Sequence, residues 1–230
     1  PLHPHPRFVG SSQRGLYGDV VQELDDSVAQ VLAKLSELGM DENTIVVFSS
    51  DNGAWRTMRD HGGSNGILSG GKLTAFEGGH RVPALVRWPR VIPAGQVNKE
   101  LATMMDWFVT LAGYAGATVP GDRAIDGKSL QGVLEGEGKR EDTPFFYFAL
   151  RPPHEQQAHR LAAVRDGNWK LHAPQRGYYP RMLEPLMAVG LFHLGELLFD
   201  LASDPGETRN VIDDHPEVAQ RLRQMMAEFE

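Results

Sequence analysis

Hydrophobic positions in the first half of the chain switch between helical spacing and short continuous runs. Over residues 17–38 the apolar side chains recur every three or four positions, which predicts an amphipathic helix that Gly39 is placed to end. Acidic residues crowd the first half of this helix, and we expect them, Asp19 included, to lie on its solvated face. Residues 44–48 are β-branched or aromatic without helical period, which is typical of a central strand buried on both faces.

The pattern continues with a second strand and a second helix. Residues 82–89 form an apolar run bounded by prolines, and residues 99–113 place apolar side chains on one helical face. Asp106 falls inside this helix and is interpreted as a surface or capping carboxylate. Helices that alternate with strands predict an α/β domain, which we assign to residues 1–139.

The remaining residues, 140–230, differ in character and predict a small C-terminal α+β subdomain. Several short apolar runs indicate an antiparallel sheet, and the pair of runs on either side of Asp166-Gly167 has the pattern of a hairpin. The last residues have the spacing of an amphipathic helix. The predicted strands are 145–150, 161–165, 169–172 and 197–201, and the predicted helix is 216–229.

Composition and charge exclude several classes of function. A net charge of −7, without a basic run carrying interleaved aromatics, argues against a nucleic-acid partner. No stretch approaches the roughly 18 apolar residues of a membrane span. The absence of cysteine removes disulfides, thiolate metal sites and a cysteine nucleophile from these 230 residues. Because the chain begins at proline instead of methionine, we expect it to be part of a longer protein, and its compartment stays unknown.

Two polar side chains follow the first predicted strand directly. Asp51 and Asn52 supply hard oxygen ligands of the type that Ca²⁺ or Mg²⁺ requires, and Gly53 lets the backbone turn away sharply. Ligands in open α/β sheets bind beyond the carboxyl ends of strands, which is where this pair is predicted to lie. The same residues are also common in ordinary turns, so local sequence leaves both interpretations open.

Residues 53–81 are rich in glycine and poor in apolar periodicity, which indicates a functional loop. Lys72 follows two glycines that would allow backbone to approach a ligand, and its ammonium suits a sulfate or phosphate oxygen. A solvated lysine is the alternative. The histidines His3, His5, His61 and His80 have no recognisable metal-binding spacing.

Taken together, several motifs of this chain resemble the type I, formylglycine-dependent sulfatases. The resemblance is closest to the arylsulfatase A and N-acetylgalactosamine-6-sulfatase group, and the motifs follow the family order over nearly all 230 residues. The motifs are Phe8–Asp19, Glu23–Ser27, Ser49–Gly53, Gly71-Lys72, Phe76–Pro83 and Asp204–Glu207.

This resemblance implies a fold, a metal and a reaction. The fold would be the C-terminal part of an alkaline-phosphatase-like sheet with flanking helices, followed by a small antiparallel sheet packed with a helix. Asp51 and Asn52 would be two of the four protein ligands to a Ca²⁺ ion, with Mg²⁺ as the less favoured metal. Lys72 would contact sulfate oxygens and stabilise charge in the transition state. The complete protein would hydrolyse an aryl or carbohydrate sulfate monoester.

The chain also departs from the family pattern. It contains no Cys/Ser-x-Pro-x-Arg motif, the source of the formylglycine nucleophile, and the two further metal-binding aspartates and the catalytic histidine would also precede residue 1. We therefore expect these groups upstream in the same protein, and we expect the 230-residue chain alone to be inactive. The missing N-terminal half would be its partner, and the oligomeric state is unknown.

Three alternatives remain. One is hydrolysis of phosphate or phosphonate esters within the same superfamily, the second is a non-catalytic module that binds sulfate or glycan, and the third is a purely structural fragment. The substrate is expected to be a sulfated small molecule or glycan, with residues 173–194, among them Arg176, Tyr178, Tyr179, Arg181 and Met182, shaping its binding site. The family resemblance implies a periplasmic, secreted or lysosomal location.

Overall fold

The computed structural model describes residues 2–150, 159–174 and 195–229. The chain divides into two compact units, each assembled from separate segments. The predicted division after residue 139 stays a prediction. Unit 1 contains Pro1–Glu23, Ser50–Pro83 and Thr143–Glu230, and unit 2 contains Leu24–Ser49 and Ala84–Asp142.

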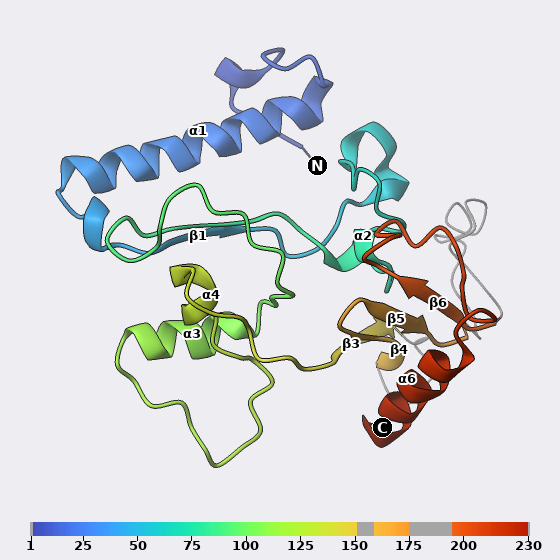
Figure 1. Cartoon of the computed structure of the whole chain (residues 1–230). Helices are drawn as coiled ribbons and strands as arrows, with labels where there is room; N and C mark the ends of the chain where they lie inside the picture. Colours follow the sequence, from blue (N-terminus) through green and yellow to red (C-terminus); the bar gives the residue numbers. More distant parts are fainter. Residues whose placement is uncertain (1, 151–158, 175–194, 230) are drawn as a thin grey trace. The chain divides into compact units, whose positions relative to one another are not determined.

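A four-stranded antiparallel sheet with a helix on one face forms the centre of unit 1 (Figure 1). The strands pair in chain order, and α6 (Pro216–Phe229) packs against the two middle strands. Both the hairpin and the final helix were predicted from the sequence and are confirmed. The strands are β3 (Phe145–Leu150), β4 (His159–Asp166), β5 (Trp169–His172) and β6 (Leu197–Asp200).

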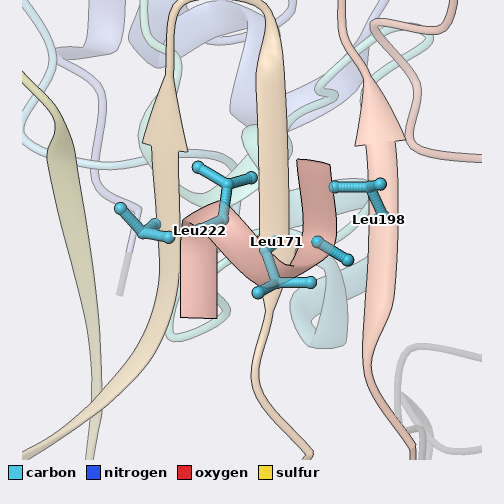
Figure 2. Packing of buried hydrophobic residues seen from close by; sticks show 5 residues of the cluster. Leu171, Leu198 and Leu222 are labelled. Atoms are coloured by element: carbon cyan, nitrogen blue, oxygen red, sulfur yellow. The ribbon is translucent and has the colours of Figure 1, made fainter. Parts of the chain in front are cut away.

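One of the apolar clusters of unit 1 lies between this sheet and α6. Because successive side chains of a strand point to opposite faces, each strand contributes alternate residues to the core. Glycine at position 167 has a φ of +57°, which permits the tight turn between β4 and β5. Figure 2 shows the leucines at the centre of this core. The fully buried core residues are Val164, Leu171, Leu198, Ala219 and Leu222.

The first long helix, α1 (Gly15–Glu37), confirms the predicted amphipathic helix, and Gly39 follows it with a φ of +65°. The expectation for Asp19 was wrong, because this residue is only 3% exposed. The loop before the helix folds back over it, so that Asp19 accepts backbone hydrogen bonds from Gly10 at 2.9 Å and Ser12 at 2.8 Å.

In unit 2 the predicted first and second strands pair with each other. β1 (Val46–Ser49) and β2 (Ala84–Arg87) form an antiparallel two-stranded sheet. The predicted burial of β1 on both faces was wrong for this chain, since Val47 is 37% and Phe48 is 36% exposed. Within the described residues β1 has a single neighbouring strand, so little of the chain covers its side chains.

The second predicted helix is shorter than expected. α3 (Asp106–Tyr114) begins seven positions after residue 99, and α4 (Gln131–Glu135) follows it. Asp106 is fully buried and not on the surface. Its carboxylate forms an ion pair with Arg140 at 2.9 Å and accepts the backbone N–H groups of Thr103 and Lys128, both at 2.7 Å, which explains why a charged group is tolerated there.

Another ion pair in unit 2 joins β2 to the segment that precedes β1. Arg87 of β2 donates through both terminal nitrogens to the Asp41 carboxylate, each at 2.7 Å.

Across the described ranges of the chain, none of the helices combines the length and apolar character that a membrane-crossing segment requires.

Candidate functional site

The turn that carries Asp51 and Asn52 is held by the Ser50 side chain and by the Gly78-Gly79 segment. Ser50 Oγ donates to the backbone oxygen of Asn52 at 3.0 Å, and Gly53 N–H donates to the oxygen of Gly79 at 3.0 Å. A Cβ atom at position 53 would lie 1.7 Å from the Gly78 oxygen. Only glycine fits there, so the sharp turn predicted after Asp51-Asn52 has a steric cause.

Lys72 lies on a second turn that is hydrogen-bonded to the first. Its backbone N–H donates to the oxygen of Ala54 at 3.0 Å, two residues after Asn52. Within the turn, Gly71 N–H donates to Thr74 Oγ1 at 3.1 Å. The Lys72 Nζ atom lies 5.3 Å from the centroid of the Trp55 ring. The structure thus brings the Asp51-Asn52 turn and the Lys72 turn into one loop assembly.

A third part of this assembly, Asn65, was not singled out by the sequence. Its side-chain oxygen accepts the backbone N–H of Ala54 at 2.8 Å, and its side-chain nitrogen donates to the Gly70 oxygen at 2.9 Å. A single amide therefore bridges the two turns. No local periodicity marks such a residue, although the surrounding glycines signal close backbone packing.

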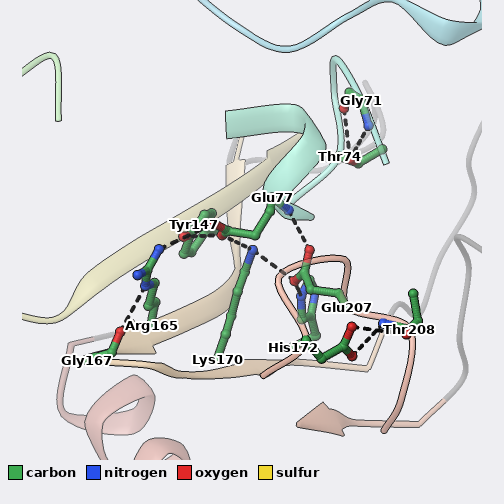
Figure 3. A network of polar contacts seen from close by, with 11 residues as sticks. Gly71, Thr74, Glu77, Tyr147, Arg165, Gly167, Lys170, His172, Glu207 and Thr208 are labelled. Atoms are coloured by element: carbon green, nitrogen blue, oxygen red, sulfur yellow. Dashed lines mark hydrogen bonds and ion pairs between the residues drawn. The ribbon is translucent and has the colours of Figure 1, made fainter. Parts of the chain in front are cut away.

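The loop continues into α2 (Glu77–His80), whose first residue enters a buried polar network (Figure 3). Glu77 is 2% exposed. Its Oε1 atom accepts from Tyr147 at 3.0 Å and from Lys170 at 2.9 Å, and its Oε2 atom accepts from Arg165 at 3.3 Å. The face of the sheet that is turned away from α6 thereby anchors the chain at Glu77, five residues after Lys72.

A second carboxylate, Glu207, completes the network. Its Oε1 atom lies 3.0 Å from Lys170 Nζ and 2.7 Å from His172 Nε2, and its Oε2 atom accepts the backbone N–H of Glu77. Glu207 has a φ of +52°, an uncommon conformation for a non-glycine residue. These contacts indicate that the Asp204–Glu207 motif holds the start of α2 in place through Glu207.

Charge balance determines the protonation of this network. Burial alone would raise the pKa of the Glu77 carboxyl, but the positive charges of Lys170 and Arg165 and the hydrogen bond from Tyr147 hold this pKa below its ordinary value. Burial, followed by the negative charge of Glu77, raises the pKa of Tyr147 well above its ordinary value. Glu77 is therefore ionised and Tyr147 neutral near pH 7, so the phenol donates to the carboxylate.

Two of the histidines that lack metal-binding spacing, His5 and His80, make structural contacts. His5 Nδ1 accepts the backbone N–H of Arg7 at 3.4 Å, which caps the short 3₁₀ helix Pro6–Phe8. The ring of His80 packs edge-on against Tyr147 at 4.9 Å. Burial and then the charge of Lys170 lower the pKa of His80, which favours its neutral form.

The side chains of the candidate site are of the types that bind a hard cation and an oxyanion. Within the described part of the chain, the side chains of Asp51, Asn52 and Lys72 have no protein hydrogen-bond or ion-pair partner, which leaves their polar atoms available to a ligand. Nowhere in the described part of the chain do three or more His, Cys, Asp or Glu side chains form a group that could hold a metal ion. Since Ca²⁺ takes about 6–8 oxygen ligands, Asp51 and Asn52 fit part of such a site.

The predicted substrate-shaping residues Arg176, Tyr178, Tyr179, Arg181 and Met182 lie outside the described residues. The network residues on the sheet were placed on strands by the sequence but were given no role. The alternation Trp169-Lys170-Leu171-His172 is the one local signal, because it places Lys170 and His172 on the face opposite the apolar core.

Known proteins match this chain along its whole length. Residues 2–117 match the family described as Sulfatase, and residues 71–230 match the family described as N-sulphoglucosamine sulphohydrolase, C-terminal. Steryl-sulfatase of Mus musculus is 40% identical over 256 aligned residues, covering 98% of this chain and 38% of the mouse protein. N-acetylgalactosamine-6-sulfatase of Homo sapiens is 48% identical over 149 residues, covering 64% of this chain and 28% of the human protein.

A solved structure supports the fold. This structure is described with the metabolism of multiple glycosaminoglycans by Bacteroides thetaiotaomicron, and it matches with a TM-score of 0.81 and 30% identity, covering 100% of this chain and 47% of that one. The chain spans less than half the length of these relatives. The predicted α/β, alkaline-phosphatase-like fold is confirmed. Because both family matches and the sequence identities agree along its length, this chain belongs to the sulfatase family, in the type I group that its motifs resemble.

Proposed function

We propose that the complete protein hydrolyses a sulfate monoester, either an aryl or a carbohydrate sulfate. The observation that carries this proposal is the loop assembly in which the Lys72 N–H bonds to Ala54, two residues after Asn52. It joins a cationic group and two oxygen ligands within a chain of the sulfatase family. Those are the groups that an anionic sulfate ester requires.

In this proposal the three side chains have two roles. Asp51 and Asn52 bind a divalent cation, for which Ca²⁺ is preferred because both ligands are hard oxygens. The chemistry that bound Ca²⁺ supplies is neutralisation of negative charge on sulfate oxygens. Lys72 donates hydrogen bonds to a sulfate oxygen and stabilises the charge that grows there as the ester bond breaks. The Trp55 ring beneath its Nζ atom limits where that ammonium can lie.

The nucleophile has to come from other residues of the complete protein. The 230 residues contain no cysteine and no Ser-x-Pro-x-Arg sequence, so we propose that a formylglycine outside this chain attacks sulfur. Two further metal ligands and a catalytic histidine are proposed to come from the same region. The 230-residue chain alone is therefore expected to be inactive.

Exposed apolar side chains support the proposal that further residues of the same protein cover part of this chain. Leu85 of β2 is 61% exposed, and Phe108 of α3 is 54% exposed. Val31 of α1 is 56% exposed. Large apolar side chains in such numbers indicate surfaces that are buried in the complete protein.

We further propose an exported or lysosomal location. The family resemblance supports it, and fractionation of cells expressing the complete protein would test it.

Substrate comparison tests the proposed reaction. The complete protein would be assayed on matched aryl sulfate, aryl phosphate and aryl phosphonate monoesters and on a panel of sulfated monosaccharides. We expect turnover of at least one sulfate ester and a clear preference for sulfate over the other two ester classes. Higher kcat/KM on the phosphate or phosphonate ester would overturn the proposal. Binding of sulfated ligands without turnover would instead identify a non-catalytic module.

A further inference from the structure

Asn65 lies at the point where three backbone segments of the loop assembly meet. Its amide oxygen accepts from Ala54 at 2.8 Å and its amide nitrogen donates to Gly70 at 2.9 Å. The first contact lies two residues after Asn52, and the second lies two residues before Lys72. The side chain is half-buried, so both hydrogen bonds are partly shielded from water.

The surrounding backbone leaves little room for any other arrangement. A Cβ atom at position 71 would lie 2.5 Å from the Ala54 oxygen and 3.3 Å from Asn65 Nδ2. A Cβ atom at position 78 would lie 3.0 Å from the same nitrogen. The two glycines therefore let the turns close onto the Asn65 amide, which is packed on several sides by backbone.

We infer that Asn65 is a positioning residue that fixes the separation between the Asp51-Asn52 turn and Lys72; this inference rests on the proposed sulfatase function. An amide is suited to this role because it accepts and donates from one planar group. An aspartate could only accept, and an aliphatic side chain could do neither. Because both polar atoms of the Asn65 amide are hydrogen-bonded to backbone, it would act through the placement of Lys72 and Asn52.

Removing the amide is expected to lower the turnover number of the complete protein. In the complete protein, Asn65→Ala should reduce kcat on an aryl sulfate by about ten- to hundred-fold, since a displacement of roughly 1 Å in a catalytic group costs about that much. Asn210→Ala is the matched control. Like Asn65, Asn210 makes two side-chain hydrogen bonds to backbone, with its Oδ1 accepting from Leu198 at 2.9 Å and Ile212 at 3.2 Å, but it lies outside the loop assembly. The control should keep wild-type kcat.

A double-mutant comparison distinguishes positioning from general damage. If Asn65 acts through Lys72, the Asn65→Ala effect on kcat should fall to about twofold or less in a Lys72→Ala background, because the two changes are then not additive. Asn65→Asp, which keeps the acceptor and loses the donor, should fall between wild type and Asn65→Ala. An equal loss of kcat from Asn65→Ala in both backgrounds would overturn the inference.

Amide hydrogen exchange supplies a readout that does not depend on activity. The Lys72 N–H donates to Ala54 at 3.0 Å, so loosening the two turns should speed exchange at Lys72 in the Asn65→Ala protein. Exchange there should be unchanged in Asn210→Ala. Unaltered Lys72 exchange in Asn65→Ala would refute the inference even if the complete protein is a sulfatase. Absence of sulfate-ester turnover by the wild-type protein would instead refute the proposed function.

Discussion

Replacing Lys170 by methionine should strongly destabilise the fold, because the substitution leaves buried carboxylates without their shared cation. Lys170 is fully buried, and its Nζ atom lies 2.9 Å from Glu77 and 3.0 Å from Glu207. It also lies 4.0 Å from the centroid of the Tyr147 ring. Methionine has a similar length and preserves packing, so the change removes mainly the charge.

The expected loss follows from the charge count of the network. Among the described residues, two carboxylates face two cations, Lys170 and Arg165, and of the two carboxylates Arg165 pairs with Glu77, at 3.3 Å. Without Lys170, Glu207 keeps only His172 as an ionisable partner among the residues described. Breaking a buried ion pair in this way costs about 3–5 kcal/mol. We therefore expect the free energy of unfolding of the complete protein to fall by that amount.

Denaturant unfolding of the complete protein, followed by intrinsic fluorescence, would measure this loss. Arg223→Met is the control, because Arg223 pairs with Glu196 at 2.7 Å on the surface, where its side chain is 44% exposed. Exposed pairs contribute about 0–1 kcal/mol, so the control should stay close to wild type. Adding Glu207→Gln to Lys170→Met should recover part of the loss by removing one buried charge. A Lys170→Met protein as stable as the control would refute this account of the network.

Three further predictions concern the core, the acid response and the metal. Leu222→Ala should cost about 2–5 kcal/mol of unfolding free energy, whereas Leu38→Ala, at a side chain that is 60% exposed, should cost under about 0.5 kcal/mol in the same denaturation assay. Because the pKa of Glu77 lies below its ordinary value of 4.5 in the folded state, its contribution to stability is fully present above pH 4.5 and is lost as pH falls through the folded-state pKa. Thermal unfolding across pH 3–7 should therefore depend less on pH in Glu77→Gln, and an unchanged profile would contradict the assignment. Asp51→Ala should raise the Ca²⁺ dissociation constant of the complete protein roughly tenfold or more by calorimetry, while Asp25→Ala, on exposed helix surface, should leave it unchanged.

Local sequence patterns predicted the positions of helices and turns better than they predicted the burial and the partners of single residues. Helical spacing over residues 17–38 corresponds to α1 at Gly15–Glu37, and the Asp166-Gly167 turn joins β4 and β5 as expected. Both depend on interactions between residues close in sequence, which periodicity and turn chemistry capture. The burial of Asp106 depends on Arg140, 34 positions away, and no local pattern shows such a partner.

The same limit explains which parts of the candidate site the sequence could supply. Asp51, Asn52 and Lys72 stand in short motifs whose residue types match the chemistry, so they were accessible to motif reasoning. The contact between Glu77 and Glu207 spans 130 positions and joins a loop to a turn in another segment of the chain. Asn65 bridges two turns through a side chain that turn statistics treat as ordinary. Such residues become visible only through tertiary contacts.

Lys72→Ala in the complete protein is the most direct test of the central claim, that this loop assembly neutralises sulfate oxygens during ester cleavage. We predict that kcat on an aryl sulfate falls by about 10²–10³, as expected when a charge-stabilising donor is removed, while bound Ca²⁺ stays at the wild-type level. Lys34→Ala, at an exposed lysine on α1, should leave both quantities unchanged. A Lys72→Ala protein that retains wild-type kcat would contradict the account.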